Sequence, residues 1–462
     1  MGEESMTASM EKKGSKQSNS SLSGFAAVVS GLLERLPYGK LTLYQPDGEK
    51  LVYGREHSVH GKEHPRGRYV EAQIKVLDNN FFSRVVMFGH IGFAESFMDG
   101  EWQTDDIASV VAWFLLNLND NPLLEGTGNK SILVNALGAL NQLLHLFKFN
   151  NKDNSRKNIS YHYDLSNDLF ELFLDETMTY SSARFSDDWL LSLKDAQISK
   201  YEALCRKLKL KEGDSLLEIG CGWGGFAQYA VSKYRIKYTG ITISKEQLAY
   251  AEKAFEKLPE LSGLVEFKLI DYRDMKRAMK PEGYDKIVSI EMIEAVGDEY
   301  YDAYFAKIDE LLAEDGLAAI QMITCPDNRY DLIRKNTDFI QKHIFPGSLL
   351  PCLHRISKAT SLTRLSLFEV EDLGNSYAKT LFTWQERFEA QLKKVGELGF
   401  DQVFVRKWRY YLSYCAAAFA MRNISVVQAV YSRPNNLNLC HSSFLERFAA
   451  PKNFESIGEV II

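Results

Sequence analysis

The sequence lacks any apolar run long enough to cross a bilayer. Its longest apolar stretches are Val110–Leu118, interrupted by Asn117, and Tyr410–Met421, interrupted by Ser413. A membrane-spanning helix needs about 20 consecutive apolar residues, so we expect none. Residues 1–23 are rich in Ser, Lys and Glu and have no apolar centre. This composition argues against a secretion signal and predicts a disordered tail over residues 1–24.

Paired cysteines and a basic excess are also missing. The six cysteines are scattered, without CxxC or CxxH spacing, so we expect neither a disulfide framework nor a metal site. The 55 Lys and Arg residues are outnumbered by 61 Asp and Glu residues, which gives a net charge of −6. That balance argues against a dedicated nucleic-acid binder. Together these absences predict a reduced, cytoplasmic globular protein.

The chain has 462 residues, and at about 150 residues per domain this length predicts two or three domains. Residues 41–53 form two apolar runs around the turn residues Pro46-Asp47-Gly48, which indicates a hairpin. We expect a third strand at 71–76, followed by helices at 79–88 and 105–118. This pattern predicts a small α+β domain over residues 25–120.

Residues 121–158 are a polar linker with one amphipathic segment at 132–149. Its leucines recur at helical intervals. We expect this helix to pack on its own domain. A helix that lies on a membrane surface is the alternative.

From residue 159 to residue 462, predicted strands alternate with predicted helices, which is typical of a doubly wound α/β sheet. The stretch 325–362 is long for a simple connection and predicts a functional insertion. The expected strands are 215–219, 238–243, 265–270, 284–290, 317–323, 368–373 and 426–431. The expected helices are 194–208, 225–233, 245–258, 299–313, 376–398 and 401–422.

The strongest motif is a glycine-rich turn between a predicted strand and a predicted helix, residues 216–227, LLEIGCGWGGFA. Glycines let the backbone turn tightly and approach a ligand, and the helix N-terminus offers free N–H groups. Glu218 directly precedes the glycines, and the next strand ends at Ser244 without an acid. A dinucleotide would want an acid there, whereas a carboxylate beside the loop suits a cationic ligand. These residues favour S-adenosylmethionine.

Two further clusters border this loop. Residues 161–164 (YHYD) and 178–183 (MTYSSA) precede it, and 291–297 (EMIEAVG) follows the fourth predicted strand. Ligands of open α/β sheets bind beyond the carboxyl ends of the strands, so Glu291 and Glu294 fall where chemistry is expected. Capping of the next helix is the alternative for both glutamates.

With these clusters, the sequence resembles the cyclopropane fatty acid synthases, S-adenosylmethionine-dependent enzymes that act on unsaturated phospholipid acyl chains. The resemblance covers nearly the whole chain after Leu32. It implies a Rossmann-like, seven-stranded class I methyltransferase domain preceded by a small α+β lipid-binding domain. The motifs that carry it are 97–102 (FMDGEW), 161–168 (YHYDLSND), 217–225 (LEIGCGWGG), 240–247 (GITISKEQ), 271–273 (DYR), 344–347 (IFPG), 410–416 (YYLSYCA) and 431–434 (YSRP).

The resemblance also implies the cofactor contacts. It assigns them to the residues before the glycine loop, to the loop itself and to the ends of the next two strands. These residues are Tyr180, Ser181, Glu218, Gly220, Cys221, Gly222, Trp223, Gly224, Gly225, Phe226, Thr242, Gln247, Asp271 and Tyr272.

In the family, a bicarbonate ion in the active site is thought to act as the base, held by a cysteine, a glutamate, a histidine and a tyrosine. The corresponding positions here are Ser182, Glu294, Gln321 and Tyr377, and Ile323 offers its backbone. Two of the four differ from the familiar bacterial pattern, and Ala295 replaces a usual histidine. This combination resembles the branch that contains plant cyclopropane synthase domains. We expect Glu294 to hold the base or to be the base.

The implied reaction adds the methyl carbon of S-adenosylmethionine to a cis double bond and closes a cyclopropane ring. The aromatic rings expected to stabilise the intermediate cation belong to Tyr163, Tyr180, Tyr301, Tyr304 and Tyr377. Cys415 has no neighbouring base and is interpreted as a structural thiol.

The implied partners are a phospholipid membrane surface, bound reversibly, and the unsaturated acyl chain, with a homodimer as a further candidate. Three alternatives stay open: a methyl- or methylene-branched product on the same scaffold, an N-methyltransferase of small amines, and a non-catalytic lipid-binding protein.

Overall fold

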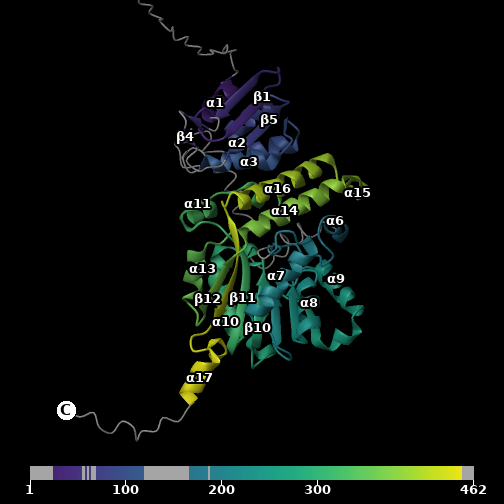
Figure 1. The fold of residues 1–462 in the computed structure, drawn as a ribbon. Coiled ribbons are helices and arrows are strands. Elements are labelled where there is room, and N and C mark those ends of the chain that lie inside the picture. Colours follow the sequence, from purple (N-terminus) through teal and green to yellow (C-terminus); the bar gives the residue numbers. More distant parts are fainter. Residues whose placement is uncertain are drawn as a thin grey trace, which may run out of the picture.

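The fold is described by a computed structural model that covers residues 24–54, 58–59, 62–63, 69–118, 166–185 and 188–449. Three segments discussed above lie outside the described residues. They are residues 1–23 of the expected tail, the 132–149 helix and the 161–164 cluster. Two sheets organise the molecule, a four-stranded one near the N-terminus and a seven-stranded one below it (Figure 1).

The four-stranded sheet has the order β2-β1-β5-β6, and the hairpin and third strand predicted from the sequence are confirmed. Its strand β5 alternates exposed and buried residues, as a sheet with one covered face requires. The elements of this unit are α1 (Gly24–Leu33), β1 (Lys40–Tyr44), β2 (Lys50–Gly54), the short pair β3 (Ser58–Val59) and β4 (Lys62–Glu63), β5 (Glu71–Val76), α2 (Asn80–Met98), β6 (Trp102–Gln103) and α3 (Ile107–Leu116).

Helix α2 ends ten residues later than the sequence predicted, at Met98 instead of Phe88. The predicted helix stopped at Phe88, and the helix has a kink at the next residue, Gly89, with φ 58° and ψ −135°. The chain resumes helical geometry after this kink because Ile91, Phe93, Ala94 and Phe97 bury their side chains. Tertiary packing therefore outweighs the local signal of the glycine.

The seven-stranded sheet has the order β12-β13-β11-β10-β7-β8-β9. The five strands from β11 to β9 are parallel, and β13 runs antiparallel between β11 and β12. The expected doubly wound sheet is confirmed. Its strands are β7 (Ser215–Ile219), β8 (Lys237–Thr242), β9 (Val265–Leu269), β10 (Tyr284–Ile290), β11 (Leu312–Thr324), β12 (Ser366–Asp372) and β13 (Ser425–Ser432).

The helices largely follow the predicted ranges, with two corrections. The helix expected at 376–398 breaks at Gln391, whose φ and ψ of −112° and 13° are not helical. The helix expected from Glu299 begins at Tyr301, after a 3-10 turn in which Asp298 pairs with Arg355. The helices are α6 (Asn167–Glu171), α7 (Leu193–Lys207), α8 (Gly225–Tyr234), α9 (Lys245–Glu256), α10 (Tyr301–Leu311), α11 (Tyr330–Lys335), α12 (Phe339–His343), α13 (Leu353–Thr360), α14 (Gly374–Ala390), α15 (Leu392–Glu397), α16 (Gln402–Ala420) and α17 (Ser442–Ala449).

The two sheets share one hydrophobic core through α14 and α16, which run between them (Figure 1). The 97–102 motif serves this junction. Phe97 packs against Tyr410 of α16, with ring centroids 6.0 Å apart. Trp102 is 1% exposed, and its indole N–H donates to the Phe93 carbonyl at 3.0 Å. The N-terminal unit is therefore fixed against the larger sheet by aromatic packing.

Replacement of Trp102 tests this junction. We expect Trp102→Ala to lower the free energy of unfolding by about 3–5 kcal/mol, because it removes a buried aromatic side chain and leaves a cavity. Chemical denaturation of the full chain measures the change. Val52→Ala, at a side chain that is 52% exposed in the same unit, is the control and should change stability by under about 0.5 kcal/mol. Equal stability of the two variants would contradict the aromatic packing within the N-terminal unit that supports Phe97.

Candidate active site

The candidate site lies at the carboxyl edge of the central strands. In the order β10-β7-β8, the chain leaves β10 and β7 toward opposite sides, so a crevice opens above the point where the connections diverge. The glycine-rich turn follows β7, and residues 291–297 follow β10. These segments, distant in sequence, meet at one cavity of about 1080 Å³.

The glycine loop leaves one open approach to its backbone. A Cβ at Gly220 would lie 2.9 Å from the Met292 side chain, and a Cβ at Gly225 would lie 2.5 Å from the Thr177 carbonyl. A Cβ at Gly222, where φ is 51°, would meet no atom within 4 Å. Gly222 thus borders open cavity, and a ligand has access to the backbone there.

Glu218 is a buried carboxylate at the end of β7. It is 2% exposed and accepts a hydrogen bond from the Tyr238 hydroxyl. Burial raises the pKa of Glu218 to about 8, although that hydrogen bond and the nearby Lys200 act in the opposite direction. Since Glu218 lines the cavity, a cationic ligand beside it would favour the ionised carboxylate.

The ends of β8 and β9 supply the remaining polar wall. Thr242 donates to the Gln247 side chain at 2.9 Å, and Ser244 caps α9 by accepting from the Gln247 N–H at 3.2 Å. Asp271 accepts two side-chain hydrogen bonds from Arg273, at 2.9 and 2.6 Å. The cofactor residues expected from the sequence line the cavity, apart from Gly224: Tyr180, Ser181, Glu218, Gly220, Cys221, Gly222, Trp223, Gly225, Phe226, Thr242, Gln247, Asp271 and Tyr272.

Behind this wall lies a buried lysine that the sequence analysis did not select. Lys200 of α7 is 0% exposed and donates to the Ser181 hydroxyl at 2.7 Å. Burial lowers the pKa of Lys200 to about 7, while Glu291, Asp175 and Glu218 act to raise it. Its ammonium group is thus the counter-charge for acidic side chains at the carboxyl edge of the sheet.

Three of the four expected catalytic residues meet around Glu291. The carboxylate of Glu291 accepts from the Ser182 backbone N–H at 2.8 Å and from the Gln321 amide at 2.7 Å. The Tyr377 hydroxyl is a third partner of Glu291. The Ser182 hydroxyl donates elsewhere, to the Ala183 carbonyl at 2.9 Å. The serine therefore contributes its backbone to this centre.

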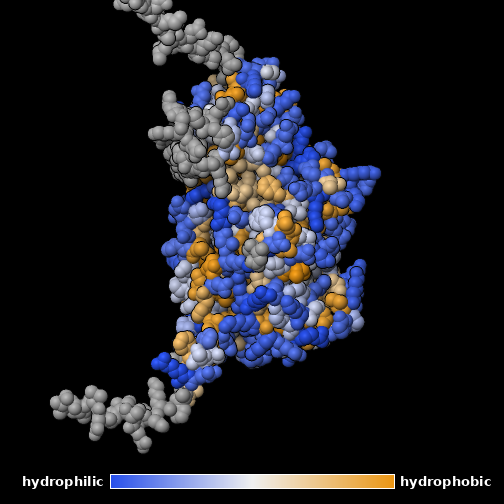
Figure 2. All heavy atoms as spheres, viewed as in Figure 1, coloured by the Kyte–Doolittle hydropathy of each residue, from blue (hydrophilic) through white to orange (hydrophobic). Residues whose placement is uncertain are grey.

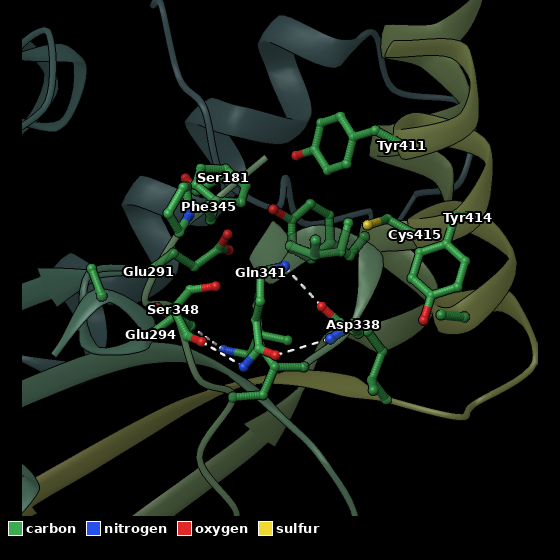
Figure 3. A pocket seen from close by; sticks show the side chains of 18 of the residues that line it. Ser181, Glu291, Glu294, Asp338, Gln341, Phe345, Ser348, Tyr411, Tyr414 and Cys415 are labelled. Carbon is green, nitrogen blue, oxygen red and sulfur yellow. Dashed lines mark hydrogen bonds between the residues drawn. The ribbon is translucent and has the colours of Figure 1, made fainter. Parts of the chain in front are cut away.

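Glu294, the fourth expected catalytic residue, has fewer partners. One oxygen accepts from the Ile323 N–H at 2.5 Å, and Oε2 is buried without a hydrogen bond. Burial and the neighbouring Glu291 raise the pKa of Glu294 to about 8. Glu291 and Glu294 lie on the same side of the cavity (Figure 3).

Beyond these carboxylates the cavity becomes apolar and reaches the N-terminal unit. The 325–362 insertion borders this part, with Gln341, Phe345 and Ser348 lining it (Figure 3). The Tyr180 and Tyr411 hydroxyl groups hydrogen-bond at 2.7 Å across it. Ligand pockets usually measure about 300–1000 Å³, and this cavity of about 1080 Å³ lies at the upper end of that range. The apolar wall residues include Val28, Leu32, Val85, Val86, Phe88, Phe93, Val111, Phe114, Leu115 and Leu118.

Of the five tyrosines expected to line the site, some line the cavity and others do not. Tyr180 and Tyr377 line the cavity. Tyr301 and Tyr304 are 0% exposed in the core beneath the sheet edge and are not among its walls. Tyr163 lies outside the described residues. Cys415 does line the cavity, but burial raises its thiol pKa well above the ordinary value, which disfavours a nucleophilic thiolate.

The central position of Glu291 is the main feature that sequence reasoning underrated. The motif 291–297 identified it, but nothing local separates it from Glu294. The backbone of the folded chain does distinguish it. Glu291 has φ 50°, a left-handed geometry that costs a non-glycine residue about 1–3 kcal/mol. Such strain is concentrated at functional sites, where the surrounding contacts maintain it.

Comparison with known proteins identifies this arrangement. The family model described as mycolic acid cyclopropane synthetase matches residues 150–429. The chain belongs to this family. It is accordingly an S-adenosylmethionine-dependent methyltransferase of the cyclopropane synthase type.

Individual members of the mycolic acid cyclopropane synthetase family are similar over most of their length. The cyclopropane-fatty-acyl-phospholipid synthase of Escherichia coli K12 is 36% identical over 375 residues, 78% of this chain and 88% of that protein. The tuberculostearic acid methyltransferase UfaA1 of Mycobacterium tuberculosis H37Rv is 36% identical over 75% of this chain and 79% of its own. The structure of mycolic acid cyclopropane synthase CmaA1 with SAH and CTAB covers 60% of this chain and 98% of its own, with a TM-score of 0.55 and 33% identity.

The open space at Gly222 gives a test of the cofactor site. We expect Gly222→Val to abolish S-adenosylmethionine binding, because the new side chain would fill the space through which a ligand reaches the backbone. Calorimetric titration measures the affinity. Gly213→Val is the matched control, since Gly213 also has a positive φ, 82°, and open surroundings but lies outside the cavity walls. Unchanged affinity of Gly222→Val would refute the assignment of the loop.

Proposed function

We propose that this enzyme transfers the methyl carbon of S-adenosylmethionine to a cis double bond of an unsaturated phospholipid acyl chain and closes a cyclopropane ring. The observation that carries the proposal is the continuous cavity. One end has the glycine loop and Glu218, the other end is apolar, and the carboxylates of Glu291 and Glu294 lie between them. A polar, cationic methyl donor and an acyl chain each match one end.

The chain's own residues prepare three conditions for this reaction. Glu218 and the glycine loop fix a cationic donor against the strand edge. The apolar wall around Phe93 and Phe114 holds an acyl chain. It disfavours water, because it offers water no hydrogen-bonding partner. Tyr180 and Tyr377 present aromatic rings to the space between, where a carbocation gains about 0.5–2 kcal/mol from each desolvated ring face. When bound, S-adenosylmethionine supplies an electrophilic methyl group on a positively charged sulfur.

The reaction centre that we propose consists of Ser182, Glu294, Gln321 and Tyr377, together with Glu291. Because Ala295 and Gln321 replace histidines of the familiar bacterial pattern, we also place the chain near the branch with plant cyclopropane synthase domains. A methyl- or methylene-branched product remains the second candidate. The similarity to the tuberculostearic acid methyltransferase UfaA1 supports this second candidate.

The test of the reaction uses the full chain, phospholipid vesicles with cis-unsaturated acyl chains, and S-adenosylmethionine. We expect S-adenosylhomocysteine to form in step with a lipid that has gained one CH2 unit and lost its alkene protons in the proton NMR spectrum. A new terminal or internal alkene would instead establish the branched product. A non-catalytic lipid-binding protein would yield no S-adenosylhomocysteine.

We further propose reversible docking on the phospholipid surface through α1, with the enzyme cytoplasmic and peripheral to the membrane. Of the described helices, none is both long and apolar enough to cross a bilayer. Helix α1 has no charged residue, and it exposes Phe25, Val28 and Leu32 by 49%, 49% and 39%. Its surface is an apolar patch near the top of the molecule in Figure 2. Val28 and Leu32 also line the cavity, so docking there would bring acyl chains to its apolar end.

The double variant Phe25→Ser with Val28→Ser tests this docking. We expect it to bind vesicles at least about tenfold more weakly, because about 1.4 kcal/mol of apolar burial is lost. Vesicle sedimentation measures the binding. The control is Val52→Ser with Leu77→Ser, which removes side chains of 52% and 45% exposure from the same unit outside the cavity. Equal loss in both double variants would exclude α1 as the docking surface.

The domain limits and the oligomeric state complete the proposal. We take residues 25–120 as a lipid-binding domain, 121–158 as a linker and 159–462 as the methyltransferase domain. A homodimer is our working expectation, and analytical ultracentrifugation of the full chain tests it.

A further inference from the structure

Glu291 has a backbone conformation that residues other than glycine rarely adopt. It follows β10 directly, with φ 50°. Its side chain keeps intermediate exposure although it lies at the centre of the molecule, because it faces the cavity. Figure 3 shows its carboxylate directed into the space between Phe345 and Gln341. The backbone thus holds a carboxylate at the reaction centre in a conformation that glycine would adopt more easily.

The donors around Glu291 are those that the sequence assigned to a bicarbonate ion. The Ser182 N–H and the Gln321 amide donate to Oε1 at 2.8 and 2.7 Å, and Tyr377 is the third partner. The orientation of the Gln321 amide is fixed, since its oxygen accepts from Gln428 at 3.0 Å. The donors therefore serve a carboxylate of the chain itself. A separate bicarbonate does not fit this donor set.

The two glutamates differ in how well their charged forms are stabilised. Glu291 accepts two hydrogen bonds, and the Tyr377 hydroxyl and the nearby charge of Lys200 also act to lower its pKa. Glu294 has the Ile323 N–H on one oxygen and no partner for the other. Two adjacent carboxyl groups withdrawn from bulk solvent do not both ionise readily, and the one with more hydrogen-bond donors ionises first. Burial raises the pKa of both groups, but the additional donors make Glu291 the carboxyl group that ionises first.

We propose that Glu291 itself is the base of the reaction, in place of a bound bicarbonate. The inference rests on the proposed function. After methyl transfer, the substrate carries a new methyl group beside a carbocation. A Glu291 oxygen takes one proton from that methyl group, and the electron pair of the broken C–H bond forms the third ring bond at the cationic carbon. Glu291 becomes a neutral acid, and its proton passes to solvent before the next turnover.

Replacement by the isosteric amide gives the first test. We expect Glu291→Gln to bind S-adenosylmethionine as the wild type does and to lose at least about 100-fold in kcat, the lower range for a base. Glu299→Gln, at an exposed glutamate of the same segment, is the control and should keep the wild-type rate. We expect Glu291→Asp to retain partial activity and to show an increased isotope effect on kcat with a deuterated methyl donor, because the displaced base slows proton removal.

A cavity variant tests whether the chain supplies its own anion. Glu291→Gly removes the carboxylate, suits the local φ, and leaves the donors of Ser182, Gln321 and Tyr377 open. We expect it to be as inactive as Glu291→Gln and to recover activity with added formate or bicarbonate. The amide variant should not recover, because its side chain still fills the site. The wild-type rate should be independent of bicarbonate in carbonate-free buffer.

Two results would overturn the inference: a wild-type rate that falls when bicarbonate is removed, or Glu291→Gln turning over at the wild-type rate. Both require a wild-type enzyme that forms the ring product. Failure of the proposed function would appear differently, as absence of that product from the wild type itself.

Discussion

The burial of several charges beside one another at the carboxyl edge of β7 and β10 is the constraint on which the site depends. Glu218, Glu291, Glu294 and Lys200 are all withdrawn from bulk water, and burial opposes the charged form of each of them. In such an environment a few hydrogen bonds decide which group is ionised. The structure gives most of these donors to Glu291 and one to Glu294, so two similar side chains three residues apart acquire different properties.

This constraint explains the architecture around the edge. A cavity that holds little water must be lined by protein on several sides. The carboxyl ends of the strands of the seven-stranded sheet form only one of these sides. The insertion with α11 and α12 forms one wall, α16 another, and α2 and α3 of the N-terminal unit line the far end. Helix α12 is tied to α2 by Glu95, which pairs with Lys342 at 2.6 Å and His343 at 2.9 Å. The N-terminal unit is thus part of the active-site enclosure.

The same enclosure relates the chemistry to the substrate. An alkene is a weak nucleophile, and the cation formed from it would react with any water present. A cavity that is polar at the donor end and apolar at the acyl end admits both reactants while leaving water few partners. The contact of Phe97, which packs on Trp102 within the N-terminal unit, with Tyr410 of α16 joins the two units beside the cavity.

Much of this protein was determined by short stretches of sequence. The alternation of strands and helices, the glycine turn after β7 and the location of Glu291 and Glu294 beyond β10 were all visible, because periodicity and turn chemistry act within about ten residues. The choice between the two glutamates was not visible. The partners of Glu291 come from positions 182, 321 and 377, more than 100 residues away on one side and between 30 and 86 on the other.

Local signals also failed where packing overruled them. The helical spacing was visible only as far as Phe88, yet the buried face of residues 91–97 continues α2 beyond the kink at Gly89. Ser182 was assigned to the site from its position alone, and only the fold shows that its backbone N–H reaches Glu291 while its hydroxyl donates to the Ala183 carbonyl. The sequence by itself determined the scaffold and the cofactor loop. Only the tertiary structure decided which carboxylate receives the hydrogen bonds, because burial and donor geometry arise when distant segments pack together.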